Sequence, residues 1–117
     1  MQNAAGASAF QNLLVWQRGM EVTKLAYIIA RDLPKIEQFA LSDQMRRCAI
    51  SIPSNIAEGA KRGKKEFAYF LRIANGSAAE LETQLLLAES LYSADTNRIL
   101  QELTVLQKML ESLIRKL

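Results

Sequence analysis

The chain has 117 residues, a formal net charge of +3 at pH 7, one cysteine and no histidine. This length fits one domain, and the lone Cys48 excludes an intrachain disulfide. The absence of histidine excludes catalytic triads with a histidine base, and a single cysteine excludes zinc sites built on Cys and His. We therefore expect no metal ion and no cofactor.

Residues 1–9 are small and polar, with neither a basic residue nor an apolar run. They predict a disordered N-terminal segment and no signal peptide. Residues 10–117 then form the single folded domain. No stretch reaches the roughly 18 to 20 apolar residues that a membrane span needs. We expect a cytoplasmic protein without a membrane partner.

The first two helices follow from apolar periodicity and from helix-ending residues. The first is predicted from about residue 14 to 33, because Pro34 pushes the residue before it out of the helical region. After a loop, Ser42 is the predicted N-cap of the second helix, with Asp43 in its first turn. Pro53 lies inside this helix and predicts a kink.

The second helix carries two stripes at helical spacing. One is apolar and includes Cys48, which we expect to be a buried, reduced thiol. The other is polar and is rich in amides and hydroxyls, whereas an ordinary solvated face carries mostly Lys and Glu. We call it the polar stripe, and it consists of Gln44, Arg47, Ser51, Asn55, Glu58 and Arg62. Its composition predicts specific hydrogen bonds.

The third helix is predicted from about residue 65 to 92 and the fourth from about residue 96 to the end. Gly76 costs about 1 kcal/mol relative to alanine inside a helix, so it predicts a close helix contact. Short connections predict an all-α fold, an antiparallel up-down four-helix bundle. The first, third and fourth helices are apolar on more than one side, so we expect a homo-oligomer.

Antiparallel packing of the second and third helices would place Arg47 level with Ser77 and Glu80, which extend the polar surface. A structural ion pair between Arg47 and Glu80 is favoured over an acid–base dyad. Asn55 and Glu58 face the start of the first helix, where a buried polar cluster would fix register and a ligand pocket is the alternative. Glu58 lies far from Glu80, so the two acids would not share a substrate, and we expect no enzyme.

Positive charge is concentrated in one part of the chain. The segment 46–72 has seven basic and two acidic residues. Its densest cluster is Lys61, Arg62, Lys64 and Lys65, at the predicted turn between the second and third helices. Clustered cations are what phosphate binding needs, so these four residues are the candidate nucleic-acid site. The alternative is an ordinary solvated turn.

Three blocks of the sequence resemble a known family. They read F-x-x-L-x-V-W-Q (10–17), Q-M-R-R-C-A-x-S-I-P-S-N-I-A-E-G (44–59) and F-L-R-I-A-N-G-S-x-x-E-L-E-T-Q (70–84). The chain resembles the bacterial four-helix-bundle family whose first members were encoded in intervening sequences of 23S rRNA genes. Family members are similar to the accessory proteins of diversity-generating retroelements.

The resemblance implies a ring-like homopentamer with a basic surface that binds RNA or DNA. It also implies a protein partner such as a reverse transcriptase. Two functions stay open at this point. One is a non-enzymatic, nucleic-acid-binding ring, and the other is a protein–protein interaction scaffold that binds no nucleic acid.

Overall fold

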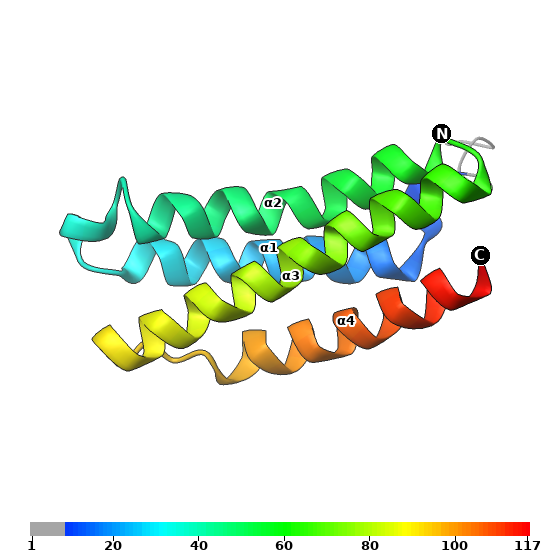
Figure 1. The fold of residues 1–117 in the computed structure, drawn as a ribbon. Helices are drawn as coiled ribbons and strands as arrows, with labels where there is room; N and C mark the ends of the chain where they lie inside the picture. Colours follow the sequence, from blue (N-terminus) through cyan, green and yellow to red (C-terminus); the bar gives the residue numbers. More distant parts are fainter. Residues whose placement is uncertain (1–8) are drawn as a thin grey trace.

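A computed structural model describes residues 9–117 (Figure 1). Within this range it has four α-helices, two short 3-10 turns and no strand. The helices are α1 (Leu14–Asp32), α2 (Leu41–Ala60), α3 (Lys64–Tyr92) and α4 (Asn97–Lys116), and the 3-10 turns are η2 (Phe10–Asn12) and η3 (Lys35–Glu37). The all-α prediction with four helices is confirmed. Apart from Ala9, the predicted disordered segment lies outside the described residues.

Consecutive helices run in opposite directions along a common axis (Figure 1). Each helix packs against the next one in sequence, and α4 also contacts α1. The end of the molecule that holds the α2–α3 turn therefore also holds the start of α1 and the end of α4. Residues from all four helices meet at that end.

The core is built from one face of each helix. Leu71, Leu81 and Leu85 of α3 are fully buried, and α4 contributes the buried Leu103 and Leu106. Burying a side chain of this size stabilises the fold by about 1.5–3 kcal/mol relative to leaving it in water. The outer faces are more polar, and no helix within residues 9–117 combines the length and apolarity of a membrane span.

Pro53 lies in the middle of α2, where it removes one backbone donor. The carbonyl left without that donor is the one four residues earlier, on Ala49. In the structure the Thr23 hydroxyl of α1 lies 3.0 Å from the Ala49 carbonyl oxygen and 2.8 Å from that of Gly19. The single Thr23 hydroxyl proton is shared between these two carbonyls, so a side chain on the neighbouring helix partly replaces the hydrogen bond that proline cannot donate.

The predicted N-cap of α2 is wrong. The helix begins two residues earlier than predicted, at Leu41 after the N-cap position Ala40, and the Ser42 hydroxyl is buried and donates to the Ala30 carbonyl of α1 at 2.9 Å. The Glu37 carboxylate instead accepts the backbone N–H of Leu41 at 3.2 Å and also the hydroxyl of Tyr92. A carboxylate from the preceding loop therefore satisfies the helix start, and Ser42 joins two helices.

Two helical glycines have opposite surroundings. A Cβ placed on Gly59 would lie 2.7 Å from the Cβ of Phe70 and 3.3 Å from the Cα of Phe67. Gly59 therefore allows α2 and α3 to approach closely. A Cβ on Gly76 would meet nothing within 4 Å. The close contact predicted at Gly76 is absent within the described chain, and the close approach occurs at Gly59.

Candidate nucleic-acid interface

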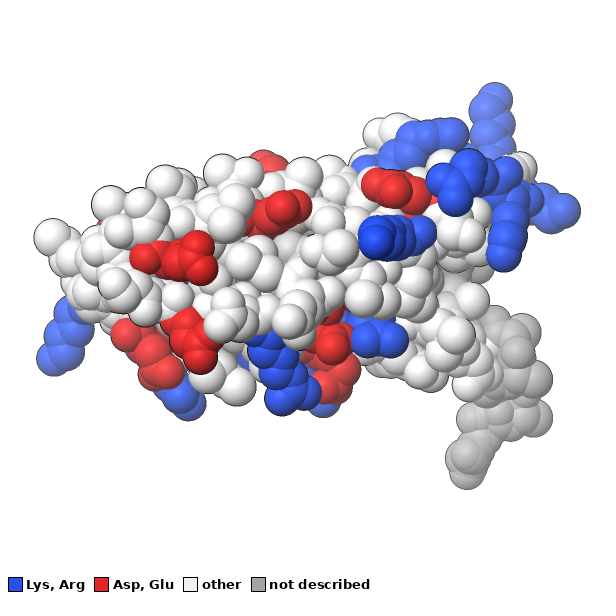
Figure 2. Space-filling view, turned by 90° about the horizontal axis from the view of Figure 1, so that it is seen from below, with Lys and Arg blue, Asp and Glu red and all other residues white. Residues whose placement is uncertain are grey.

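The four predicted cations lie together at one end of the bundle. Lys61 and Arg62 follow the last turn of α2, while Lys64 and Lys65 open α3. All four are exposed. Figure 2 shows Lys and Arg side chains gathered at this end of the molecule. We call the surface formed by Lys61, Arg62, Lys64 and Lys65 the basic end.

The four cations are not equivalent. The Arg62 guanidinium pairs with the Glu58 carboxylate at 2.6 Å and lies 5.1 Å from the Phe70 ring centroid. Lys61, Lys64 and Lys65 form no ion pair with any other residue in the range 9–117. Lys61 Nζ lies 6.0 Å from the Phe10 ring centroid, but none of the three lysines has a carboxylate partner within the described residues, so all three can meet an external anion.

Two further features at this end were missed by the sequence reasoning. The first turn of α3 follows Gly63, and no side chain from the described part of the chain caps it. Its free N–H groups and the positive end of the helix dipole favour an anion beside the lysines. Arg115 and Lys116 also lie at this end, because α4 finishes there. Only the tertiary arrangement brings these distant residues together.

The predicted polar stripe joins α2 to α3. The first half of the stripe, from Gln44 to Ser51, lies beside an open pocket of about 290 Å³ between the two helices. The pocket is lined by Gln44, Arg47, Cys48, Ser51, Glu80 and Gln84. The Ser51 hydroxyl donates to the Ser77 hydroxyl, and the Asn55 amide donates to the Ser51 carbonyl at 2.7 Å. Ser51, Asn55 and Ser77 therefore form one hydrogen-bonded group, with Glu80 beside it.

Two interactions expected of this stripe are not present. Arg47 does not pair with Glu80, because its guanidinium binds Asp43 one turn earlier in the same helix at 2.8 Å. Glu58 is not buried against α1, since its side chain is 49% exposed and pairs with Arg62. An exposed pair four residues apart contributes about 0.3–0.5 kcal/mol. In the single chain, Glu58 is therefore a minor stabilising residue.

Cys48 lies at the edge of the polar pocket and is half-buried. Its Sγ is 3.1 Å from the Ser77 carbonyl oxygen and 4.0 Å from a carboxylate oxygen of Glu80. Burial, with the negative charge of Glu80, raises the pKa of the thiol from its ordinary 9.0 to about 11. Cys48 is thus a protonated, weakly nucleophilic thiol at neutral pH, not a catalytic one.

We predict that Cys48 alkylates slowly at pH 8. A pKa of about 11 instead of 9.0 leaves a roughly 100-fold smaller thiolate fraction than in the unfolded chain. Because the folded pKa is the higher one, the thiol favours the folded state below pH 9, and this contribution is lost between pH 9 and 11. Iodoacetamide rates against pH, in buffer and in urea, measure both midpoints. A native midpoint near 9 would contradict the predicted environment.

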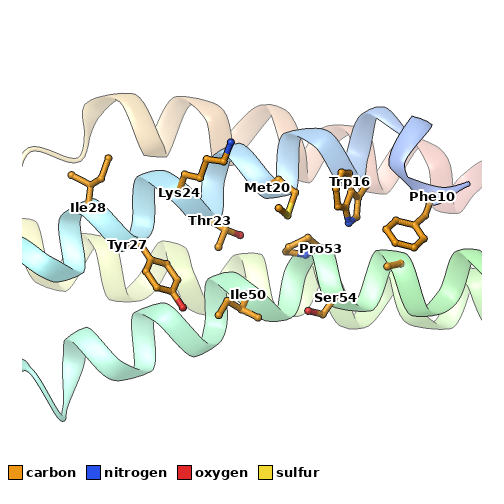
Figure 3. A pocket seen from close by; sticks show the side chains of 11 residues that line it. Phe10, Trp16, Met20, Thr23, Lys24, Tyr27, Ile28, Ile50, Pro53 and Ser54 are labelled. Carbon is orange, nitrogen blue, oxygen red and sulfur yellow. The ribbon is translucent and has the colours of Figure 1, made fainter. Parts of the chain in front are cut away.

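An open apolar groove of about 740 Å³ runs between the outer faces of α1 and α2 (Figure 3). Tyr27, Ile28 and Ile50 are exposed along it, while Trp16 and Pro53 form its floor nearer the basic end. Among the described residues that line it, Lys24 carries the only charge. The groove offers mainly apolar contact area, and its titratable groups within residues 9–117 are Lys24 and the Tyr27 phenol.

The blocks quoted from the sequence occupy the packed parts of α1, α2 and α3. A family model described as 23S rRNA-intervening sequence protein matches residues 11–112. No curated protein matches the chain significantly. The family match spans η2, α1, α2, α3 and most of α4, and therefore nearly the whole described fold. This chain belongs to the 23S rRNA-intervening sequence protein family.

Proposed function

We propose that this chain is a non-enzymatic accessory protein of the cytoplasm that binds RNA or DNA through the basic end. Its antiparallel up-down bundle would assemble into a homopentameric ring. The observation that supports binding most directly is that Lys61, Lys64 and Lys65 are exposed beside the start of α3, with neither an ion-pair partner nor a side-chain helix cap among residues 9–117. Unpaired surface cations release counterions from a phosphate backbone on binding, which drives sequence-independent association.

Assembly is supported by apolar surface that one chain leaves exposed. Leu87 and Leu91 of α3 and Val105 of α4 are exposed, as are the apolar side chains of the groove between α1 and α2. A ring would cover these faces and would repeat the basic end on each subunit. Several weak phosphate sites on one particle act together, which raises affinity without any new contact.

A protein–protein scaffold is the second candidate. The groove between α1 and α2 favours it, because its lining is apolar and a protein partner could bury it. The two candidates differ in what the basic end does. Only a nucleic-acid-binding protein needs its three unpaired lysines for its function.

Replacing Lys61, Lys64 and Lys65 together with glutamate is expected to abolish nucleic-acid binding. The change reverses the charge at the phosphate-binding surface, and all three side chains lie outside the core. Titrations of labelled RNA and DNA at low and at physiological salt measure it, with binding by the wild type falling steeply as salt rises. The matched control carries the same change in charge at the opposite end, as Arg31→Glu, Lys35→Glu and Arg98→Glu.

The control variant should bind nearly as well as the wild type, and both triple variants should keep the wild-type mass by light scattering. If the Lys61, Lys64 and Lys65 variant binds as tightly as the wild type, the nucleic-acid site does not lie at the basic end. No binding by the wild type at low salt would reject a nucleic-acid function and leave the scaffold.

A further inference from the structure

Tyr69 is an exposed aromatic residue among cations. It lies in the second turn of α3 with 59% of its surface exposed, and its hydroxyl bonds to no other residue in the range 9–117. Lys65 and Arg72, four residues before it and three after it, share its side of the helix, as does the exposed Glu66 three residues before it. Both cations are exposed and lack an ion-pair partner within the described chain. Tyr69 and these two cations extend the basic end along about 10 Å of helix axis.

The Tyr69 ring also packs against the neighbouring Phe70 ring. The two rings pack in a T-shaped arrangement, with centroids 5.4 Å apart and planes at 82°. Phe70 in turn packs beside Gly59 of α2 and under the Arg62 guanidinium. A ring supported in this way loses little freedom when a ligand stacks on it. The core does not require Tyr69 at this position, because most of its surface faces solvent.

We propose that the nucleic acid bound at the basic end is single-stranded, and that an unpaired base stacks on Tyr69 while Lys65 and Arg72 hold its flanking phosphates. This inference rests on the proposed nucleic-acid function and adds the class of ligand. A duplex keeps its bases stacked on one another, so a ring on a helix surface can stack only on an unpaired base. An aromatic ring flanked by cations is the usual arrangement for binding single strands without a sequence preference.

The test compares two probes and three variants. The probes are a labelled oligothymidine of about 20 nucleotides, longer than a typical single-strand site, and a duplex of the same length. Tyr69→Ala should weaken binding of the single strand by roughly 5- to 150-fold, as expected for the loss of one stacked base. Tyr69→Phe keeps the ring and should bind as the wild type does. Phe39→Ala removes an exposed aromatic residue just before α2, at the end of the bundle opposite the basic end, and serves as the control.

Three readouts separate stacking from a merely structural role. The dependence of affinity on salt should be the same for Tyr69→Ala and the wild type, because the phosphate contacts remain. Binding of the duplex should be weaker than that of the single strand and unaffected by Tyr69→Ala. The mass by light scattering should also be unchanged.

Three results would overturn the inference while leaving the proposed function intact. The first is equal binding of the duplex and the single strand. The second is a Tyr69→Ala variant that binds the single strand as the wild type does. The third is a Tyr69→Ala variant of altered mass, which would place the Tyr69 side chain between subunits. If the wild type binds neither probe at low salt, the proposed function itself fails, and the inference fails with it.

Discussion

Replacing Gly59 with alanine is expected to lower the free energy of unfolding by about 2 kcal/mol, although alanine is the better helix former. The new Cβ would lie 2.7 Å from the Cβ of Phe70, closer than two carbon atoms can approach. The Phe70 Cβ is fixed to its backbone, and the Cα of Phe67 is only 3.3 Å away, so no rotamer change relieves the contact. Helices α2 and α3 must therefore separate along their closely packed interface.

Gly76→Ala is the matched control, with the opposite sign. Its Cβ would enter open space in the single chain, so the variant should be stabilised by about 0.5–1 kcal/mol through helix propensity alone. Urea unfolding followed by circular dichroism, at one protein concentration, measures both changes. A Gly59→Ala protein as stable as the wild type would show that the two helices are not packed as closely as described.

The second large effect concerns the mass of the particle in solution. We expect light scattering to give about five times the 13.1 kDa of one chain. Changing Leu87 and Leu91 together to glutamate should reduce that mass to one chain, with the helix content retained. Both leucines are exposed in the single chain, so the monomer tolerates the charges. A subunit interface would not, because an unpaired carboxylate that loses water costs several kcal/mol.

The control adds the same charge at exposed polar positions of α4, as Asn97→Glu and Gln101→Glu, and should keep the wild-type mass. A wild-type protein that is a monodisperse monomer at micromolar concentration would refute the proposed assembly. In that case the exposed leucines would need another partner, and the proposed multivalent binding of nucleic acid would lose its basis.

The helices could be predicted from the sequence because their patterns are local. Apolar periodicity placed all four helices, and Pro34 and the turn after Tyr92 placed two of the ends within about one residue. The errors arose where contacts with a neighbouring helix determine the role of a residue. Serine is a common N-cap residue, yet the Ser42 hydroxyl donates its hydrogen bond to a backbone carbonyl of α1. The close contact was predicted at Gly76, and only the position of α3 shows that it occurs at Gly59 instead.

The candidate site was predictable to a similar extent. The cluster of cations is nearly contiguous in sequence, so Lys61, Lys64 and Lys65 could be named as candidates without a structure. The partner of each charged residue was not predictable. Arg47 pairs with Asp43, four residues earlier in the same helix, because this pair forms whatever the position of α3. Arg115 and Lys116 have no local signal and join the same end only through the course of α4.

The hydrogen bond from Thr23 to the carbonyl that Pro53 leaves unsatisfied makes these two positions depend on each other. While proline occupies position 53, loss of the Thr23 hydroxyl leaves the Ala49 carbonyl between two helices without a hydrogen-bond donor. If position 53 instead carries a residue with a backbone N–H, α2 can satisfy that carbonyl itself, and Thr23 becomes free to vary. A mutational path through this fold would therefore change position 53 first and position 23 second, and the reverse order would pass through a less stable intermediate.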